Sequence, residues 1–284
     1  MDINPEKLAN FRIHTFRNET ADRLRNQNDA INFVNERGFV FFWPITGIIL
    51  PSLWVAAAGN RPVADKHDDP GHITWDWKDE LLGTGIWYYG RVLARKNCMI
   101  SLKVLPYFYA LSPNYGEPET DYLQNYQKGE LPLDAKNVYE ALLKEGPLDS
   151  IALRRAAHIT GKGTDSRFNK ALEVLQSSFR IMPIGTSKSG AWHYAFVYDL
   201  FHRHFPDQIN ISRSISESAA KKLLILTYLK SVGSCTEKDL SKLFRWDQTS
   251  IETEVKSLVS SSQIIDNIGL NNDIHPYLSL TELL

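Results

Sequence analysis

Residues 133–206 carry the side-chain pattern that most restricts the fold of the chain. In TDSRFNKALEVLQSSF (164–179), apolar residues recur at spacings of three and four, which predicts a helix whose buried stripe is Phe168, Ala171, Leu172, Leu175 and Phe179. LDAKNVYEALLKEG and LDSIALRRAAHI before it predict two shorter helices, and FRIMPIG and GAWHYAFVYD after it predict two strands joined by a polar turn. Helix, helix, helix, strand, turn and strand is the order of a winged helix-turn-helix domain.

Residues 207–284 repeat this order more faintly. Three helices are predicted by AAKKLLILTYLKSVG, TEKDLSKLF and TSIETEVKSLVSSS, and two wing strands could form from QIIDNIG and YLSLTEL. The predicted fold class is therefore α+β and mainly α, with tandem winged helix-turn-helix domains that carry short wing strands.

We expect four segments along the chain. Residues 1–60 form an N-terminal helical or winged-helix-like segment, where a short helix ends at Gly38 and FVFFWPITGIIL follows as buried strand and loop. Residues 61–132 form an irregular connecting region that is rich in Trp and Tyr, in which IWYYGRVL and NCMISLKVL are either strands or a short helix. Residues 133–206 form the central winged helix, and residues 207–284 form a C-terminal winged-helix-like domain.

The composition excludes several classes of protein. The 284 residues include 32 basic and 33 acidic side chains, which argues against a highly basic nucleic-acid coat protein. Among the four segments only 133–206 has an excess of basic side chains, 10 against 7 acidic, so an anionic partner should meet it first. The longest apolar run, Ile45 to Gly59, contains Pro51 and is too short to span a membrane, and the N-terminus is polar. We therefore expect a cytoplasmic protein without membrane contact.

Motifs for cofactors are missing from the sequence. Cys98 and Cys235 lie far apart, which excludes a zinc cluster built on cysteine and fits reduced thiols. The chain has no GxSxG, GxGxxG or GxxxxGK[ST] motif, which disfavours both a serine hydrolase and a nucleotide-dependent enzyme. We expect no metal, no nucleotide cofactor and no other cofactor.

The helix predicted at 164–179 is the first candidate for contact with duplex DNA, because the third helix of a winged helix enters the major groove and the wing touches the backbone. Its outward side chains are of the types that contact base edges and phosphate. The candidate residues are Arg167, Asn169, Lys170 and Gln176, with Arg154 and Arg155 from the preceding helix and Lys188 from the wing turn. The alternatives are a solvated helix face and a surface for a protein partner.

A second candidate site combines aromatic and acidic residues. Asp68 and Asp69, beside His67, could act as general acid and base in a cleft. Nearby side chains could stack on a displaced base or line that cleft. They are Phe41, Trp43, Trp75, Trp77 and Lys78. The alternatives are a hydrophobic core for the rings, and a turn-shaping or helix-capping role for the carboxylates.

Three stretches resemble a known family. They are GFVFFWPI (38–45), HDDPGHITWDWKDELLG with WYYGRVLARK (67–96), and GPLDSIALRRAA through SRFNKALEVLQSSFRIMPIG to WHYAFVYD (146–199). Together they are similar to the bacterial AlkZ/YcaQ-like winged-helix proteins over about two-thirds of the chain. The resemblance implies tandem winged helices that form a concave DNA-binding surface. Characterised members of that family are DNA glycosylases that release alkylated bases and unhook interstrand crosslinks.

The resemblance also implies a catalytic motif, which this sequence does not keep. In the family, Gln-x-Gln or Gln-x-Asp directly before a proline positions or activates the attacking water. The matching residues here are Phe41-Phe42-Trp43 before Pro44, and neither Phe41 nor Trp43 can polarise water. If hydrolysis is retained, the substitute carboxylate would come from Asp68 or Asp69.

Three functions are compatible with these patterns. The first is a DNA-binding tandem winged-helix protein that lacks the family's catalytic motif and contacts duplex DNA, damaged or intact, through a concave surface. The second is an active DNA glycosylase that removes alkylated or crosslinked bases with a substitute carboxylate. The third is a winged-helix module that binds a protein partner and no DNA.

Overall fold

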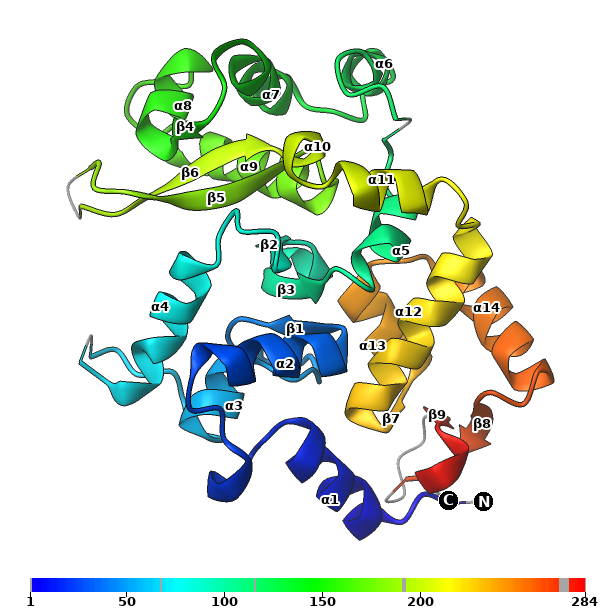
Figure 1. The fold of residues 1–284 in the computed structure, drawn as a ribbon. Coiled ribbons are helices and arrows are strands. Elements are labelled where there is room, and N and C mark those ends of the chain that lie inside the picture. Colours follow the sequence, from blue (N-terminus) through cyan, green and yellow to red (C-terminus); the bar gives the residue numbers. More distant parts are fainter. Residues whose placement is uncertain (1, 67, 115, 191–192, 271–275, 284) are drawn as a thin grey trace.

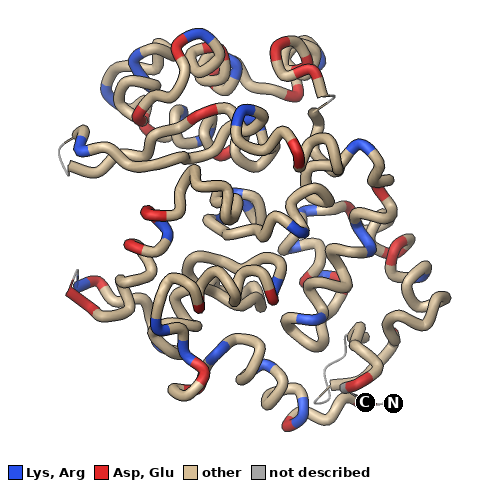
Figure 2. The backbone as a smooth tube through the Cα atoms, in the orientation of Figure 1, with Lys and Arg blue, Asp and Glu red and all other residues tan. Residues whose placement is uncertain are grey.

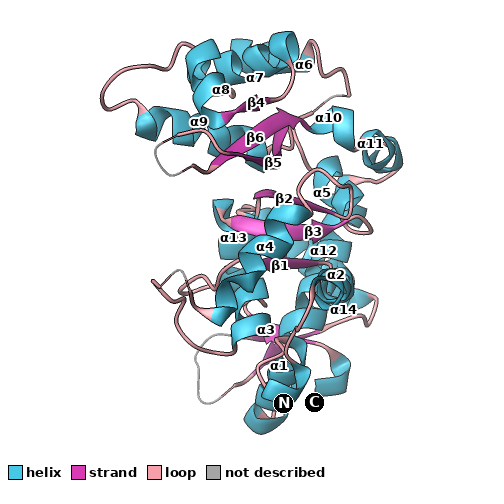
Figure 3. Cartoon of the chain, turned by 60° about the vertical axis from the view of Figure 1, so that its left-hand side comes forward, coloured by secondary structure: helices cyan, strands magenta, loops and turns pink. Residues whose placement is uncertain are grey.

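The computed structural model describes residues 2–66, 68–114, 116–190, 193–270 and 276–283. Helices predominate, and the named strands of the described residues form three small antiparallel sheets (Figures 1 and 3). The order helix, strand, helix, helix, strand, strand occurs three times along the chain. In each sheet the last strand of this order lies between the other two.

The first occurrence spans residues 27–101 and is called the N-terminal unit below. Its helices are α2 (Gln27–Arg37), α3 (Leu53–Ala58) and α4 (Ile73–Glu80), and its strands are β1 (Phe39–Phe41), β2 (Trp87–Arg91) and β3 (Asn97–Ser101). Two single 3-10 turns belong to it, η2 (Pro70–His72) before α4 and η3 (Leu93–Arg95) between β2 and β3.

The central unit, residues 133–200, and the C-terminal unit, residues 217–279, repeat the same order. The central unit consists of α7 (Leu133–Glu145), β4 (Leu148–Asp149), α8 (Ser150–Ala156), α9 (Asp165–Ser177), β5 (Ile181–Ser187) and β6 (Ala195–Leu200). The C-terminal unit consists of α12 (Glu217–Val232), β7 (Ser234–Cys235), α13 (Glu237–Phe244), α14 (Gln248–Ser260), β8 (Ile265–Ile268) and β9 (Tyr277–Ser279).

Shorter elements precede, join and follow the units. They are α1 (Pro5–Thr15), η1 (Thr20–Asp22), α5 (Leu105–Ala110), α6 (Asp121–Gln127), α10 (Phe201–His204), α11 (Pro206–Ser212) and η4 (Thr281–Leu283).

The helices expected from apolar periodicity in the last two segments are confirmed. The five residues of the predicted stripe are all buried, four on α9 and Phe179 just after it. Helix α8 starts after Asp149, whose side chain accepts hydrogen bonds from the backbone N–H groups of Ile151 and Ala152. Thr236 and Asp239 form a reciprocal capping box at the start of α13.

Residues 61–132, expected to be irregular, contain α4, β2, β3, α5 and α6. The division at residue 60 also cuts through one sheet, because β3 pairs with β1 on one side and with β2 on the other. The stretches IWYYGRVL and NCMISLKVL, for which the sequence leaves strand and short helix both open, form β2 and β3. The choice is open because Trp87, Tyr88 and Tyr89 are consecutive and all buried, so no alternation of apolar and polar residues marks the strand.

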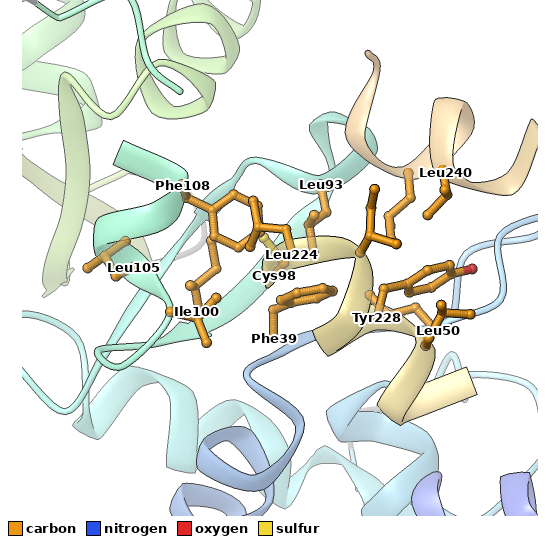
Figure 4. Packing of buried hydrophobic residues seen from close by; sticks show 14 of the residues in the cluster. Phe39, Leu50, Leu93, Cys98, Ile100, Leu105, Phe108, Leu224, Tyr228 and Leu240 are labelled. Carbon is orange, nitrogen blue, oxygen red and sulfur yellow. The ribbon is translucent and has the colours of Figure 1, made fainter. Parts of the chain in front are cut away.

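The N-terminal and C-terminal units share one hydrophobic core. Phe39 and Ile100 of the N-terminal sheet pack with Leu224 and Tyr228 of α12, and Phe108 of α5 closes the cluster (Figure 4). The Tyr228 hydroxyl also donates a 2.8 Å hydrogen bond to the carbonyl of Ile49. These two units therefore form one packed body.

The central unit has a core of its own, built mainly from α7, α8, α9 and the sheet that they cover. In Figures 1 and 3 it forms a separate layer beside the other two units. No helix in the described ranges is both long and apolar enough to cross a membrane.

A buried ion pair anchors α6 to the central unit. The Arg180 guanidinium donates to Asp121 at 2.9 Å and to the amide oxygen of Asn125, and the side chains of Arg180 and Asp121 are both 2% exposed. Removing the cation would leave the Asp121 carboxylate buried without its guanidinium.

We therefore expect Arg180→Met to lower the free energy of unfolding by about 3–5 kcal/mol in urea denaturation. Arg17→Met is the matched control, because Arg17 pairs with Glu36 at 2.9 Å where both side chains are partly exposed. That control should change stability by no more than about 1 kcal/mol. Equal losses in the two variants would contradict the structural role of the buried pair.

Candidate functional site

A cavity of about 810 Å³, called the tryptophan cleft, opens beside α4 in the N-terminal unit. Its aromatic side consists of Trp43 and Trp75, whose ring centroids are 5.8 Å apart, and of His72, 6.3 Å from Trp75. Its acidic side is formed by Asp65, Asp68, Asp69 and Asp76. A flat ring that carries positive charge has the shape and electrostatics to match this lining.

Both tryptophans of the cleft carry a hydrogen-bond donor without a partner. The indole Nε1 atoms of Trp43 and Trp75 are buried and have no acceptor among the described residues. A buried N–H without a partner costs free energy. Both tryptophans were expected at a stacking site, and the structure brings them together.

The carboxylates predicted to be catalytic have different surroundings. Asp69 caps η2 by accepting from the backbone N–H of Gly71 at 2.8 Å, and it also accepts from the Arg61 guanidinium. The bond from Arg61 and then that from Gly71 hold the pKa of the Asp69 carboxyl below its ordinary value. Asp69 therefore shapes the loop, which agrees with the turn-shaping and capping alternative for the carboxylates. Asp68 is exposed and lines the cleft.

Other residues expected in the cleft lie elsewhere. Phe41 and Trp77 belong to hydrophobic clusters, with 0% and 5% of their surface exposed, so neither can stack on a ligand. The hydrophobic-core alternative holds for both. Phe41 is in a strand buried on both faces, and Trp77 lies on the inner side of helix α4. His67 lies outside the described residues.

Lys78 is buried inside a box of aromatic rings, although it was expected to line an open cleft. Its side chain is 2% exposed. The ammonium group lies 4.7–5.7 Å from five ring centroids, those of Phe42, Trp75, Tyr89, Tyr194 and Phe196. Such positions over ring faces stabilise a cation.

The Lys78 ammonium also joins two units by hydrogen bonds. It donates to Asp79 on its own helix and to the Tyr194 hydroxyl at 3.0 Å, and that hydroxyl donates to Asp79 at 3.0 Å. Tyr194 directly precedes β6 of the central unit. Burial lowers the pKa of Lys78 below its ordinary value, while the bond to Asp79 opposes the shift. Lys78 therefore fixes the central hairpin, formed by β5 and β6 of the central unit, against α4.

A second cavity, of about 620 Å³, lies on the central unit's side of this contact and is called the arginine cleft. Its polar lining comes from Arg91 of β2, Arg154 and Arg155 of α8, and Asn169 of α9. Tyr194 also lines it, and the Tyr194 ring is 6.0 Å from the Trp75 ring of the tryptophan cleft. The contact between Tyr194 and Trp75 therefore separates the two clefts.

The residues predicted to contact DNA differ in whether their side chains already have partners within the chain. Asn169, Arg155 and Lys188 are exposed. The side chains of Arg155 and Lys188 have no hydrogen bond or ion pair with the described residues. Arg154 is committed to the turn between α8 and α9, because it donates to the Ile159 carbonyl at 2.8 Å and pairs with Asp165. It therefore orders that turn.

Two more basic residues of α9 are paired with carboxylates. Arg167 forms two hydrogen bonds with Asp134 of α7, at 2.8 and 2.6 Å, and Lys170 pairs with Glu173 at 2.6 Å. Figure 2 shows basic and acidic residues interspersed over the helices of the central unit, which agrees with this pairing. Both side chains are more than half exposed, so DNA could compete for them.

Gln176 was expected to face outward, and this is wrong. It is 2% exposed, because the C-terminal half of α9 packs against β2 of the N-terminal unit. The Tyr88 hydroxyl donates to the Gln176 carbonyl at 2.9 Å across this contact. Periodicity identifies the side of a helix that faces its own core, but not contacts with another unit.

Sequence reasoning missed several residues of the site. Asp65 and Asp76 in the tryptophan cleft, and Arg91 and Tyr194 in the arginine cleft, belong to no recognisable motif. Of these, Asp76 could have been found from the sequence. His72, Trp75, Asp76 and Asp79 have the spacing of residues that share one face of a helix, here that of α4. No group of three His, Cys, Asp or Glu side chains within the described ranges could hold a metal ion.

The lowered Lys78 pKa gives a testable pH dependence. Since the unfolded chain binds this proton more tightly, the Lys78 contribution to the free energy of unfolding rises as pH increases from the folded pKa toward the ordinary value of 10.5. Urea denaturation between about pH 8 and pH 10 should show wild type gaining stability relative to Lys78→Met. Lys170→Met, which removes an exposed lysine, should keep the wild-type slope. A common slope for all three proteins would refute the burial effect.

Comparisons with known proteins agree with this architecture. A family model described as AlkZ related matches residues 24–245. The structure of the Streptomyces sahachiroi DNA glycosylase AlkZ is similar, with a TM-score of 0.58 and 12% sequence identity over 99% of this chain and 71% of that one. A search of curated proteins gave no match. The expected resemblance is confirmed, and the chain belongs to the AlkZ-related family.

Proposed function

We propose that the protein is a DNA-binding protein of the DNA-repair type, and that its three units are winged helices. The repeated element order and the common sheet order support the assignment of the units. Membership of the AlkZ-related family supports a role connected with DNA repair. The observation that carries the proposal is the arginine cleft, which adjoins an aromatic cleft able to take a displaced base.

In this proposal the central unit holds the DNA backbone. Arg155 and Lys188 are exposed cations without partners in the described residues, so phosphate can bind them without breaking an existing ion pair. Asn169 lies near the start of α9, where an amide side chain can reach a base edge. The C-terminal half of α9 is covered by the N-terminal unit, so α9 would contact DNA by its first two turns only.

The family's motif is replaced in this proposal. Phe41 and Trp43 occupy the positions of its two polar groups, where Phe41 fills the core and Trp43 lines the tryptophan cleft. The position thus provides a surface for stacking, and the carboxylates of the cleft come from other segments.

DNA binding is tested by titrating the protein into labelled duplex DNA at several salt concentrations. Arg155→Ala and Lys188→Ala should each weaken binding and reduce the slope of log affinity against log salt by about 0.9, because each removes one phosphate contact. Lys144→Ala, on the last turn of α7 and outside both clefts, is the matched control and should change neither quantity. Absence of binding at low salt would instead favour a module that binds a protein partner.

A second candidate function is hydrolysis of the bond between an alkylated base and its deoxyribose. The observation that favours it is the pairing of indole rings with four carboxylates in one cleft, which suits a base made cationic by alkylation. Asp68 is the candidate general base for the reaction, because Asp69 is bound to Arg61. Asp68 would take a proton from water as the water oxygen bonds to C1′ and the base departs with the bonding electrons.

The prediction for this function separates the two neighbouring carboxylates. Asp68→Asn should abolish the formation of abasic sites in methylated duplex DNA, measured by strand cleavage after alkali, while DNA affinity is unchanged. Asp69→Asn should disturb the loop, and so lower thermal stability, without a selective loss of the reaction. Base release by Asp68→Asn at the wild-type rate would remove Asp68 from the mechanism.

A further inference from the structure

A third cavity, of about 410 Å³, lies where all three units meet and is called the junction cavity. It is lined by Arg95 of η3, by Phe179 just after α9, and by Arg245 and Trp246 in the turn between α13 and α14. It lies beyond the C-terminal end of α9, whereas the arginine cleft lies beside the N-terminal half of that helix. The two cavities are therefore separate sites.

The backbone around the junction cavity is strained. Nine residues other than glycine have a positive φ in the described part of the chain. Three of them line this one cavity, and each comes from a different unit: Arg95 (φ 57°), Phe179 (φ 54°) and Arg245 (φ 62°). Glycine or asparagine would adopt this left-handed conformation at lower cost. Phe179 and Arg245 adopt it where α9 and α13 end, a common way for a helix to terminate, and Arg95 is the last residue of η3. Three helical ends therefore converge on this cavity with side chains larger than the conformation favours.

Contacts within the chain do not explain why arginine occupies both positions. Arg245 is exposed, and its guanidinium has no hydrogen bond or ion pair with the described residues, although its backbone N–H donates to the Ser241 carbonyl at the end of α13. Arg95 pairs with Glu173 at 3.1 Å, but Glu173 also binds Lys170, so this carboxylate is shared by two cations. The junction cavity therefore has an excess of positive charge.

The remaining lining provides an aromatic wall and a buried hydroxyl. Phe244 and Trp246 are stacked on each other, with ring centroids 4.3 Å apart and an angle of 11° between the rings, and the Lys221 ammonium lies 5.7 Å from the Trp246 ring centroid. The Ser112 side-chain oxygen is buried without a partner among the described residues. Two guanidinium groups beside stacked rings match a phosphate ester that is attached to a planar ring.

We propose that the junction cavity binds a nucleotide, with the phosphate held by Arg95 and Arg245 and the base against the wall formed by Phe244 and Trp246. The source is either a free mononucleotide or one nucleotide of a strand, because both present the same phosphate and ring. The volume lies in the range of small-molecule sites. Since the lining comes from three units, an occupied cavity would hold the C-terminal unit against α9.

The test uses substitutions that relieve the backbone while removing the guanidinium. Asparagine tolerates the left-handed conformation, so Arg95→Asn and Arg245→Asn should not lower the midpoint of thermal unfolding. By isothermal titration calorimetry, each should weaken binding of deoxyadenosine 5′-monophosphate at least tenfold. Arg155→Ala, in the arginine cleft, is the matched control and should bind this nucleotide as wild type does. Deoxyadenosine, which lacks the phosphate, should bind far more weakly than its monophosphate.

A parallel titration with a short single-stranded oligonucleotide distinguishes the two sources. Binding of the mononucleotide that both variants weaken would identify a site for a free ligand. Binding of the oligonucleotide alone, weakened by both variants, would identify a site for one nucleotide of a strand. If neither probe binds at millimolar concentration, or if both variants bind as wild type does, the proposal is overturned. None of these results depends on catalysis or on duplex binding by the central unit.

Discussion

The burial of one ammonium ion ties the central unit to α4 of the N-terminal unit. Lys78 leaves water entirely, and a buried charge is tolerated only if other groups replace the lost hydration. Here the replacement comes from both units, because Asp79 lies on α4 whereas Tyr194 and Phe196 belong to the central hairpin. Moving the hairpin away would leave the cation without these groups. Lys78 therefore holds the hairpin beside the two clefts, and the packing of α9 on β2 holds the other side of the central unit.

The sequence predicts elements well where one face of a segment is apolar and the other polar. The stripe on α9 is of this kind. For β2 the pattern leaves strand and short helix open, because three consecutive buried aromatic residues show no alternation. The pairing of β1, β2 and β3 in one sheet could not be predicted for the same reason. The predicted exposure of Gln176 and Lys78 is wrong for a related reason, since polarity predicts exposure only where no second unit packs on the segment.

The candidate site could be predicted only in part. Trp43, Trp75 and Asp68 are near enough in sequence to suggest a cleft, and they do line one. Tyr194 and Arg91 come from distant segments and have no motif, so only the fold brings them to the arginine cleft. The different roles of Asp68 and Asp69 rest on the position of Arg61, which spacing alone does not determine.

The shared core of the outer units has a consequence for how such a chain could arise. The N-terminal and C-terminal units complete each other's interior, to which the central unit adds Phe179 and Met182, while most of the central unit's apolar residues form a core of their own. The segment before α1 also joins the C-terminal unit, since the backbone N–H of Ile3 donates to the carbonyl of Gly269 at 2.9 Å (Figure 1). The topology is therefore that of one discontinuous domain with a second domain inserted into it.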